Sequence, residues 1–481
     1  MIYMYDSLPL NQHDDKLAVI YESNHNNLVA VNTSLGQTER VDIQDIVMQG
    51  GTFGSLMCSN SIDSIGKKCF NRGGNLYLYK QLVNILPLSM VDDILAIAKC
   101  GQDSLSLNTY INTLIELKKL KFHTLDRDGK TKCHKIHVGP GNKLCPELQV
   151  HGTKMVEVSE DKYLGDIISS DGRHTKTIKQ RIGKGMGIIS DIMNLLDKVC
   201  LGEFYFTTAI ALRESMFLNG ILTNAESWYV LSKEDIQQVE DLDISLLKKI
   251  FNTKCTVPTE ALYLELGCLD ISTLLKARRL NYLHYLTTRK ENSMLFKFFL
   301  AQWNHPTKND WTEKVREDLE DFGLEADLAS IKEKSSWSFK AMVKKKAKEY
   351  AFNSFLIKKD GLDGNNGHSK LSNLFYSELK TQDYLKDMNK EKAQAVFAYR
   401  TRMAQYSDNY RDNRGHLPCP LCLVHLDCQS VSFNCPVVKE NICIKGKYDQ
   451  IFSGVITPEL AQTLMDIDKF RKDFIESRMI D

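Results

Sequence analysis

The chain has 481 residues, a length that fits about two to four domains. Its formal net charge of +1 excludes a general electrostatic attraction to nucleic acid, so any such affinity must come from local basic patches. Its 13 cysteines accompany no recognisable secretory leader and no apolar run long enough to span a bilayer. We therefore expect no membrane partner and a reducing intracellular location, in the nucleus or the cytoplasm.

Residues 1–168 mix strand-like runs with helical ones, which predicts an α+β region. A helix-like stretch from Lys16 to Asn24 precedes a strand-like stretch from Val29 to Thr33. Further β-rich or alternating runs lie at 76–79, 85–97 and 135–138.

The sequence Gln49-Gly50-Gly51 predicts a loop that a nucleotide can approach closely. Glycine lets the backbone come close to a base or sugar, and a glutamine amide can both donate and accept at a nucleotide edge. The alternative is an ordinary strand-to-helix turn capped by Thr52 or Ser55.

The acidic pair Asp92-Asp93 lies between mostly apolar residues, which run from Ile85 to Val91 and from Ile94 to Ile97. This pattern predicts a buried hairpin with the acids at its tight turn. Two like charges are costly to bury without a cation, and Mg²⁺ is usually held by one or two carboxylates together with substrate phosphates. The alternative is an exposed Asp-Asp turn, because Asp favours turns through hydrogen bonds to its own backbone.

Helical periodicity takes over after the first block. It predicts a thumb-like helical region over 169–300 and a charged helical region over 301–410, with a polar Gly/Asn break at 361–367 that suits a surface loop or linker. Residues 411–481 combine a cysteine cluster with a terminal amphipathic helix near Pro458 to Arg478.

A basic run lies within the third block, at Lys340, Lys344, Lys345, Lys346 and Lys348. Trp337, Phe339 and Tyr350 lie near it, and lysines beside aromatic rings suit phosphate contact combined with base stacking. The alternative is a solvated helix face, which is the usual role of such runs.

A cysteine cluster in the last block predicts a zinc knuckle. Cys419 and Cys422 form a Cys-x2-Cys pair, which places two thiolates on one side of a tight turn, and two further ligands complete a tetrahedral zinc site. The other candidates are Cys435 with either His425 or Cys428. The alternative is a decayed site with free thiols.

These motifs, in this order and spacing, resemble the palm of reverse transcriptases from non-LTR retrotransposons. The motifs are the Gln-Gly-Gly loop, the acidic hairpin, Leu120–Phe122 with Lys132-Cys133, and Tyr163-Leu164-Gly165. The palm resemblance runs from about residue 18 to about residue 170, and the later segments resemble the carboxy-terminal part of such element proteins. It implies an antiparallel palm sheet with helices, followed by a helical thumb and a small cysteine knuckle. It also implies that the Gln49-Gly50-Gly51 loop holds the templating base pair.

Two departures from the family pattern bear on activity. Met90 lies where an aromatic residue usually precedes the acidic pair, and the first palm motif, which carries another metal-binding aspartate, is missing. Since Lys16–Thr33 resembles the helix and strand that follow that motif, we expect the missing aspartate to precede Met1. Asp6 is the alternative, but we assign it to the connecting segment.

The resemblance also suggests roles for two weaker signals. Lys132 is placed to act on the pyrophosphate leaving group as a general acid or a neutralising charge, with Lys121 and Lys130 as alternatives. Tyr163-Leu164-Gly165 resembles the start of the hairpin that grips the primer end. A core tyrosine before a turn is the alternative reading of the same three residues.

The resemblance therefore implies a reverse transcriptase fragment that adds deoxynucleotides to a DNA primer or target on an RNA template. Two metal ions would act in the intact enzyme, with Asp92 as the main Mg²⁺ ligand from this chain and Asp93 as the secondary one. We expect the chain to be inactive by itself. The alternatives are a non-catalytic nucleic-acid-binding remnant and a degenerate reading frame without selected function.

Overall fold

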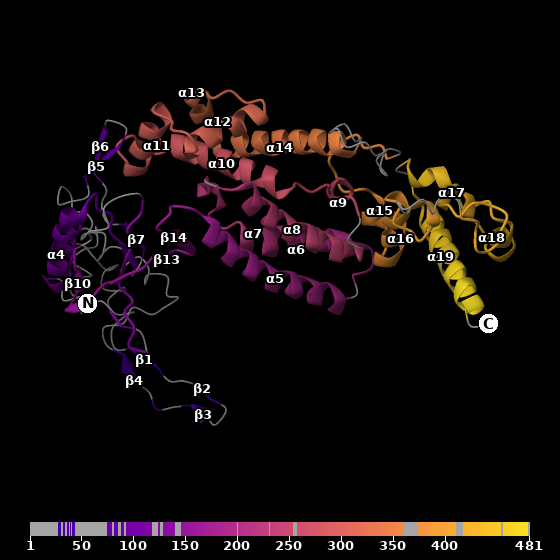
Figure 1. The fold of residues 1–481 in the computed structure, drawn as a ribbon, viewed down its shortest axis with the longest axis horizontal. Helices are drawn as coiled ribbons and strands as arrows, with labels where there is room; N and C mark the ends of the chain where they lie inside the picture. The colour runs from indigo at the N-terminus through magenta and orange to yellow at the C-terminus, as the bar shows by residue number, and fades with distance from the viewer. Residues whose placement is uncertain are drawn as a thin grey trace. The chain divides into compact units, whose positions relative to one another are not determined.

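A computed structural model gives the structure of the protein, in which the helices and small sheets form two compact units (Figure 1). The first unit comprises Met1–Gly172 and Arg289–Pro306, and the second comprises Arg173–Thr288 and Thr307–Asp481. The residues that the structure describes are 27–29, 32–33, 36–37, 39, 41–43, 75–78, 81–84, 88–90, 93–117, 124–125, 128–139, 146–199, 201–229, 231–253, 257–359, 374–409, 417–453 and 456–479.

The first unit contains short strands in two-stranded sheets. The antiparallel pairs are β1 (Asn27–Val29) with β4 (Val41–Ile43), β2 (Asn32–Thr33) with β3 (Gly36–Gln37), β5 (Asn75–Leu78) with β6 (Gln81–Asn84), β7 (Leu88–Met90) with β8 (Asp93–Leu95), β10 (Gln149–Val150) with β11 (Thr153–Lys154), and β13 (Glu160–Tyr163) with β14 (Asp166–Ser169). The pair β9 (His134–Lys135) and β12 (Val156–Glu157) is parallel. Among the described strands no sheet is larger than two strands, so a continuous palm sheet stays a prediction.

Two helices accompany these strands, α4 (Gly101–Leu117) and α11 (Met294–Asn304). Helix α4 buries Leu107, Ile111, Leu114 and Ile115, whose spacing gives the helix one apolar side. Ile94 of β8 packs against this small core, so α4 holds the strand that begins with Asp93.

The second unit is helical. Its helices are α5 (Thr175–Lys198), α6 (Tyr205–Leu212), α7 (Asn219–Ile221), α8 (Lys233–Phe251), α9 (Thr259–Leu266), α10 (Ile271–Thr287), α12 (Trp311–Asp321), α13 (Leu328–Glu333), α14 (Ser336–Lys359), α15 (Tyr384–Asp387), α16 (Lys390–Arg400), α17 (Gln429–Ser432), α18 (Pro436–Asn441) and α19 (Pro458–Met479). Shorter turns are η1 (Gly202–Phe204), the π-helical η2 (Arg213–Leu218), η3 (Ala225–Ser227), η4 (Ser407–Asn409) and η6 (Tyr448–Ile451).

One hydrophobic core runs through the second unit, from Ile178 on α5 to Ile467 on α19. It includes Phe251 of α8, whose ring stacks on Phe397 of α16 with centroids 3.8 Å apart. The predicted blocks 169–300, 301–410 and 411–481 therefore contribute to a shared core. The segment Arg289–Pro306, which the sequence analysis divided between the thumb-like and charged blocks, belongs to the first unit.

Buried ion pairs cross this core. The guanidinium of Arg213 donates to both carboxylate oxygens of Asp243, at 2.7 and 2.6 Å, and the Tyr263 hydroxyl donates to the same carboxylate at 3.1 Å. Arg400 donates to Glu265 at 2.8 Å. Since a buried charge is tolerated only with a partner, these pairs restrict how the helices can pack.

Gly267 ends α9 in the left-handed conformation, with φ of +67°. A Cβ at this position would lie 2.3 Å from the carbonyl carbon of Lys380, so the close approach of segment 380–381 requires glycine. The second unit thus depends on a backbone contact between distant parts of the chain.

The described helices include none that is long and apolar enough to cross a bilayer. Overall, the described residues are mostly helical with small sheets, in agreement with α+β composition in its broad sense.

Candidate functional site

The acidic hairpin is formed by β7 and β8, with Met90 paired to Asp93 and two residues between the strands. Asp93 is exposed, so the expectation of buried acids is wrong for this residue, because it begins β8 at the turn end of the hairpin. The exposed-turn alternative describes Asp93. Asp92 lies outside the described residues, as do Gln49, Gly50 and Gly51.

Tyr163 lies against the acidic hairpin. Its hydroxyl donates to the carbonyl oxygen of Leu88 on β7 at 3.3 Å. Burial raises the pKa of Tyr163, and the negative charge of nearby Asp93 raises it further. The structure therefore brings together two motifs that are about seventy residues apart in the sequence.

The turn after Tyr163 has a defined geometry. Tyr163 pairs with Asp166, and the two residues between them, Leu164 and Gly165, have φ of 47° and 92°. Positive φ at both central positions is typical of the tight turns that match strand twist. Glycine suits this conformation, whereas leucine adopts it at a cost.

Lys132 is exposed, and its backbone N–H donates to the carbonyl oxygen of Thr124 at 2.8 Å. No ion pair joins its ammonium group to Asp93 within the described part of the chain. The role suggested for Lys132 stays a prediction.

The cysteine cluster has the geometry of a metal site. The sulfur atoms of Cys419, Cys422 and Cys435 all lie within 4.8 Å of one another. The Cys419 N–H donates to the carbonyl oxygen of His425 at 2.7 Å, which closes the turn that carries the first two cysteines. Cys435 precedes α18 as its N-cap, and Pro436 begins the helix.

Backbone N–H groups point at two of these sulfurs. Burial raises the pKa of Cys422, but hydrogen bonds from the N–H groups of His425 and Val424 and from the neighbouring thiols bring it below its usual value. Burial raises the pKa of Cys435 to about 11, although the N–H groups of Val438 and Val437 act in the opposite direction. Such donors stabilise thiolates, so the set fits Zn²⁺, which prefers sulfur ligands.

The three cysteines leave one position of a tetrahedral zinc site to be filled, and Cys428 and His425 are the candidates for it. Cys428 is half-buried, its sulfur lies 3.4 Å from the Ser430 hydroxyl, and it lines a small cavity together with Cys419 and Cys435. His425 does not line that cavity. Cys422 does not line it either, so the cavity does not decide between Cys428 and His425, and the fourth ligand stays open.

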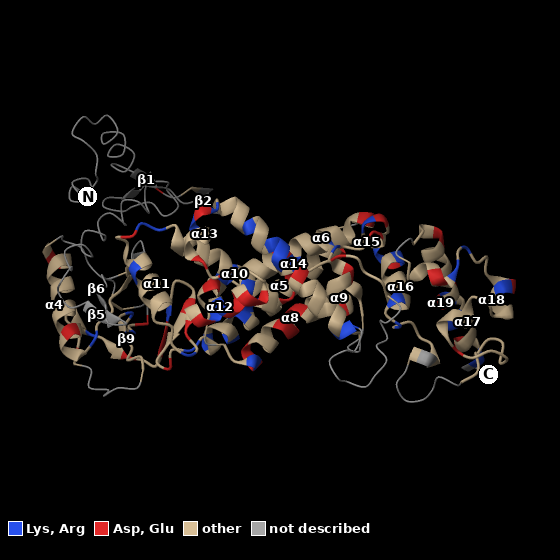
Figure 2. Ribbon diagram, turned by 90° about the horizontal axis from the view of Figure 1, so that it is seen from above, with Lys and Arg blue, Asp and Glu red and all other residues tan. Residues whose placement is uncertain are grey.

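The basic run lies on α14 (Figure 2). Lys345 and Lys346 are both within 4.0 Å of Glu349, whereas Lys340, Lys344 and Lys348 are exposed. The run is therefore only partly neutralised.

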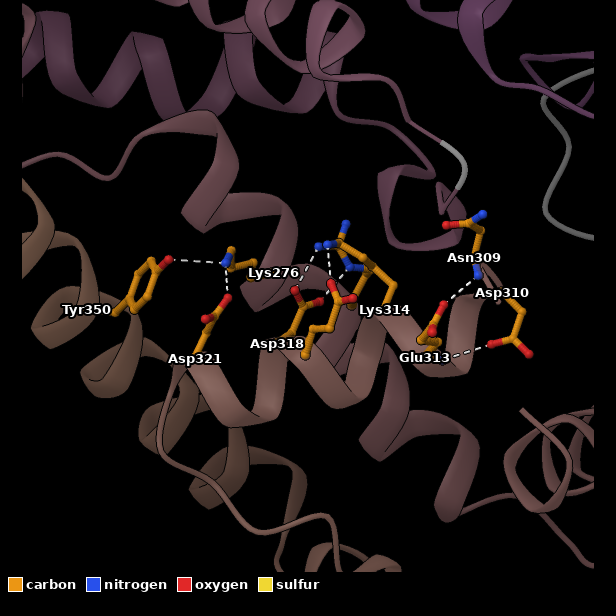
Figure 3. Close-up of polar contacts among 10 residues, drawn as sticks. Lys276, Asn309, Asp310, Glu313, Lys314, Asp318, Asp321 and Tyr350 are labelled. Carbon is orange, nitrogen blue, oxygen red and sulfur yellow. Dashed lines mark hydrogen bonds and ion pairs between the residues drawn. The ribbon is translucent and has the colours of Figure 1, made fainter. Parts of the chain in front are cut away.

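Two of the three aromatic residues near this run already contact other residues of the protein. Phe339 is buried and stacks on His284 with centroids 4.9 Å apart. The Tyr350 hydroxyl accepts a hydrogen bond from Lys276, which also pairs with Asp321 (Figure 3). Only Trp337 has an exposed ring, so the sequence analysis named too many stacking candidates.

The backbone N–H donors around Cys435, from Val437 and Val438, were not predicted from the sequence. Pro436 was the available signal, because proline is frequent at the first position of a helix and marks Cys435 as the residue just before one.

The chain matches no protein-family model and no curated protein.

Proposed function

We propose that the chain is part of an RNA-directed DNA polymerase of the non-LTR retrotransposon type, with a palm in the first unit. The contact of Tyr163 with the β7–β8 hairpin is the main support. In a palm, the residues that grip the primer end must lie beside the metal-binding acids, and this contact has that arrangement.

In this proposal the primer 3′-hydroxyl loses its proton to solvent and its oxygen attacks the α-phosphorus of a deoxynucleoside triphosphate. The bond from the α-phosphorus to the bridging oxygen breaks, and pyrophosphate leaves. Asp92 and Asp93 would hold Mg²⁺, which supplies charge stabilisation to the attacking and leaving oxygens. The exposure of Asp93 suits a ligand that binds metal together with a solvated substrate phosphate. Lys132 is the candidate that neutralises or protonates the leaving group.

The partners in this proposal are an RNA template and a DNA primer or target, inside the nucleus or the cytoplasm. The second unit would supply the thumb-like helices, with zinc in the cysteine cluster as a structural ion. The cysteine geometry supports the zinc part of the proposal.

A second candidate function is nucleic-acid binding without catalysis. It is favoured by the exposed lysines of α14 and needs no contribution from Asp92.

Primer extension separates the two functions. We assign the first metal-binding aspartate to no residue of this chain, so we expect no extension of a primed RNA template by the chain alone with Mg²⁺ and deoxynucleotides. Supplying a related amino-terminal segment that carries this aspartate should give metal-dependent synthesis. Asp92→Asn should abolish that synthesis, because it removes the charge that holds Mg²⁺, and Asp93→Asn should reduce it less.

Equal synthesis by the supplemented protein and its Asp92→Asn variant would mean that the hairpin is structural and the polymerase proposal is wrong. Extension by the unaided chain that disappears in Asp92→Ala would instead support the polymerase and overturn the expected inactivity.

A further inference from the structure

One side of α14 carries Trp337, Lys340, Lys344 and Lys348, at spacings of three, four and four residues. The helix is anchored elsewhere by Phe339, Val343 and Ala347, which are completely buried. At a rise of about 1.5 Å per residue, Lys340, Lys344 and Lys348 recur roughly every 6 Å, close to the separation of phosphates on an extended strand.

Lys340, Lys344 and Lys348 differ from the other lysines of the run in their ion pairing. None of them forms an ion pair with another described residue, whereas Lys345 and Lys346 share Glu349. This side of α14 is therefore basic although the chain as a whole has a net charge of only +1.

Trp337 is the exposed member of the four tryptophans. Its side chain is 81% exposed, whereas Trp228, Trp303 and Trp311 are 1%, 7% and 7% exposed. An exposed aromatic ring beside a row of lysines offers a flat surface for a base and cations for the adjoining phosphates.

We propose that this side of α14 binds single-stranded nucleic acid, with Trp337 stacked on a base and Lys340, Lys344 and Lys348 contacting successive phosphates. The inference rests on the nucleic-acid partner of the proposed function but not on nucleotidyl transfer. A single strand is favoured over a duplex because base pairing and stacking hide the base faces that Trp337 would contact.

A protein partner fits this surface less well. Protein-binding hot spots are buried aromatic anchors surrounded by other packed contacts. The exposed residues next to Trp337 on α14 include Ser338 and Ala341 and no second large apolar side chain. The surface is therefore a ring among cations rather than an apolar patch.

The test is the binding of a short single-stranded oligodeoxythymidine to the full chain, followed by fluorescence anisotropy. Trp337→Ala should weaken binding about 5- to 150-fold, the range expected for loss of one stacked base. Lys344→Ala should weaken binding and reduce the magnitude of the slope of log affinity against log salt by about 0.7, the value for one phosphate contact on a single strand. Lys345→Ala, which removes the same charge from the same helix, should have a much smaller effect.

Intrinsic fluorescence gives an independent readout, because Trp337 is the exposed tryptophan. The oligonucleotide should protect the acrylamide-accessible emission of the wild-type chain, and Trp337→Phe should lack that emission while keeping most of the affinity. Unchanged circular dichroism spectra would exclude misfolding of the variants.

Three outcomes would overturn the inference: equal affinity of wild type and Trp337→Ala, tighter Trp337-independent binding of a duplex of the same sequence, or stronger Trp337-dependent binding of oligoglutamate. If the inference is correct, the oligonucleotide binds through Trp337 even when primer extension fails in every form of the protein. Conversely, if synthesis depends on Asp92 but Trp337→Ala does not change the affinity for the oligonucleotide, this inference is overturned and the proposed function is not.

Discussion

Breaking the buried ion pair between Arg279 on α10 and Asp318 on α12 should strongly destabilise the second unit. Arg279 donates to the two carboxylate oxygens of Asp318 at 2.6 and 3.0 Å. The side chains are 4% and 0% exposed. Asp318 lies in the polar row along α12 in Figure 3.

Arg279→Met keeps most of the apolar stem but leaves the carboxylate of Asp318 buried without a cation. Removing one partner of a buried pair costs about 3–5 kcal/mol, which is a large part of the stability of most domains. Replacing both partners, as in Arg279→Met with Asp318→Leu, removes the uncompensated charge. We therefore expect the double variant to recover most of the lost stability, because hydrophobic replacement of a buried pair is often neutral.

Urea unfolding followed by circular dichroism and tryptophan fluorescence measures the effect. Trp311 begins α12 and is 7% exposed, so its emission reports on this region. The midpoint should fall clearly in Arg279→Met and return toward wild type in the double variant. Equal loss in both variants would show that packing volume rather than charge compensation decides stability here, and would refute the reasoning.

Three other predictions concern the second unit. Protein purified under reducing conditions should contain one zinc ion per chain by metal analysis. Cys435→Ser should abolish zinc binding, and Cys443→Ser, at an exposed cysteine, should not change it; zinc-free wild type would contradict this prediction. Burial raises the pKa of Asp468 from 3.8 to about 6, so the carboxylate destabilises the fold increasingly as pH rises through this window. Asp468→Asn should therefore stabilise the fold at pH 8 by about 3 kcal/mol, measured as a higher thermal midpoint, and have little effect below pH 4. The same gain at both pH values would rule out this titration. Gly267→Ala should cost at least about 1–3 kcal/mol in a thermal melt, whereas Gly323→Ala, also at positive φ but in open space, should cost less; equal losses would exclude the backbone clash.

Local patterns in the sequence predicted the helices better than their partners. The terminal helix expected near Pro458 to Arg478 is confirmed as α19, Pro458–Met479, because its apolar periodicity and initial proline are local signals. The ion pair between Glu265 and Arg400 joins residues 135 apart. No periodicity encodes such a pair, so the shared core of the second unit was beyond sequence reasoning.

In the candidate sites too, features set by local spacing were predicted and features set by tertiary packing were not. The Cys-x2-Cys spacing and the later Cys435 were enough to select the three sulfurs that the structure brings together. Exposure of Asp93 was misjudged because flanking apolar residues indicate the environment of strand interiors, not of the turn that joins them. The contact of Tyr163 with Leu88 depends on how two hairpins pack, which spacing alone cannot reveal.

The path of the chain between the two units has a practical consequence for dissecting this protein. Because Arg289–Pro306 belongs to the first unit, the backbone passes from one unit to the other at 172–173, 288–289 and 306–307. A protease that cuts only after Gly172 would break the covalent link to residues 1–172 but leave α11 attached to the second unit, so a fragment ending at Gly172 would lose the helix that packs beside β5 and β6. To express each unit separately, residues 289–306 must be fused to residues 1–172 through a new linker, and residue 288 must be joined to residue 307 in the second unit. Simple truncation cannot separate the two units.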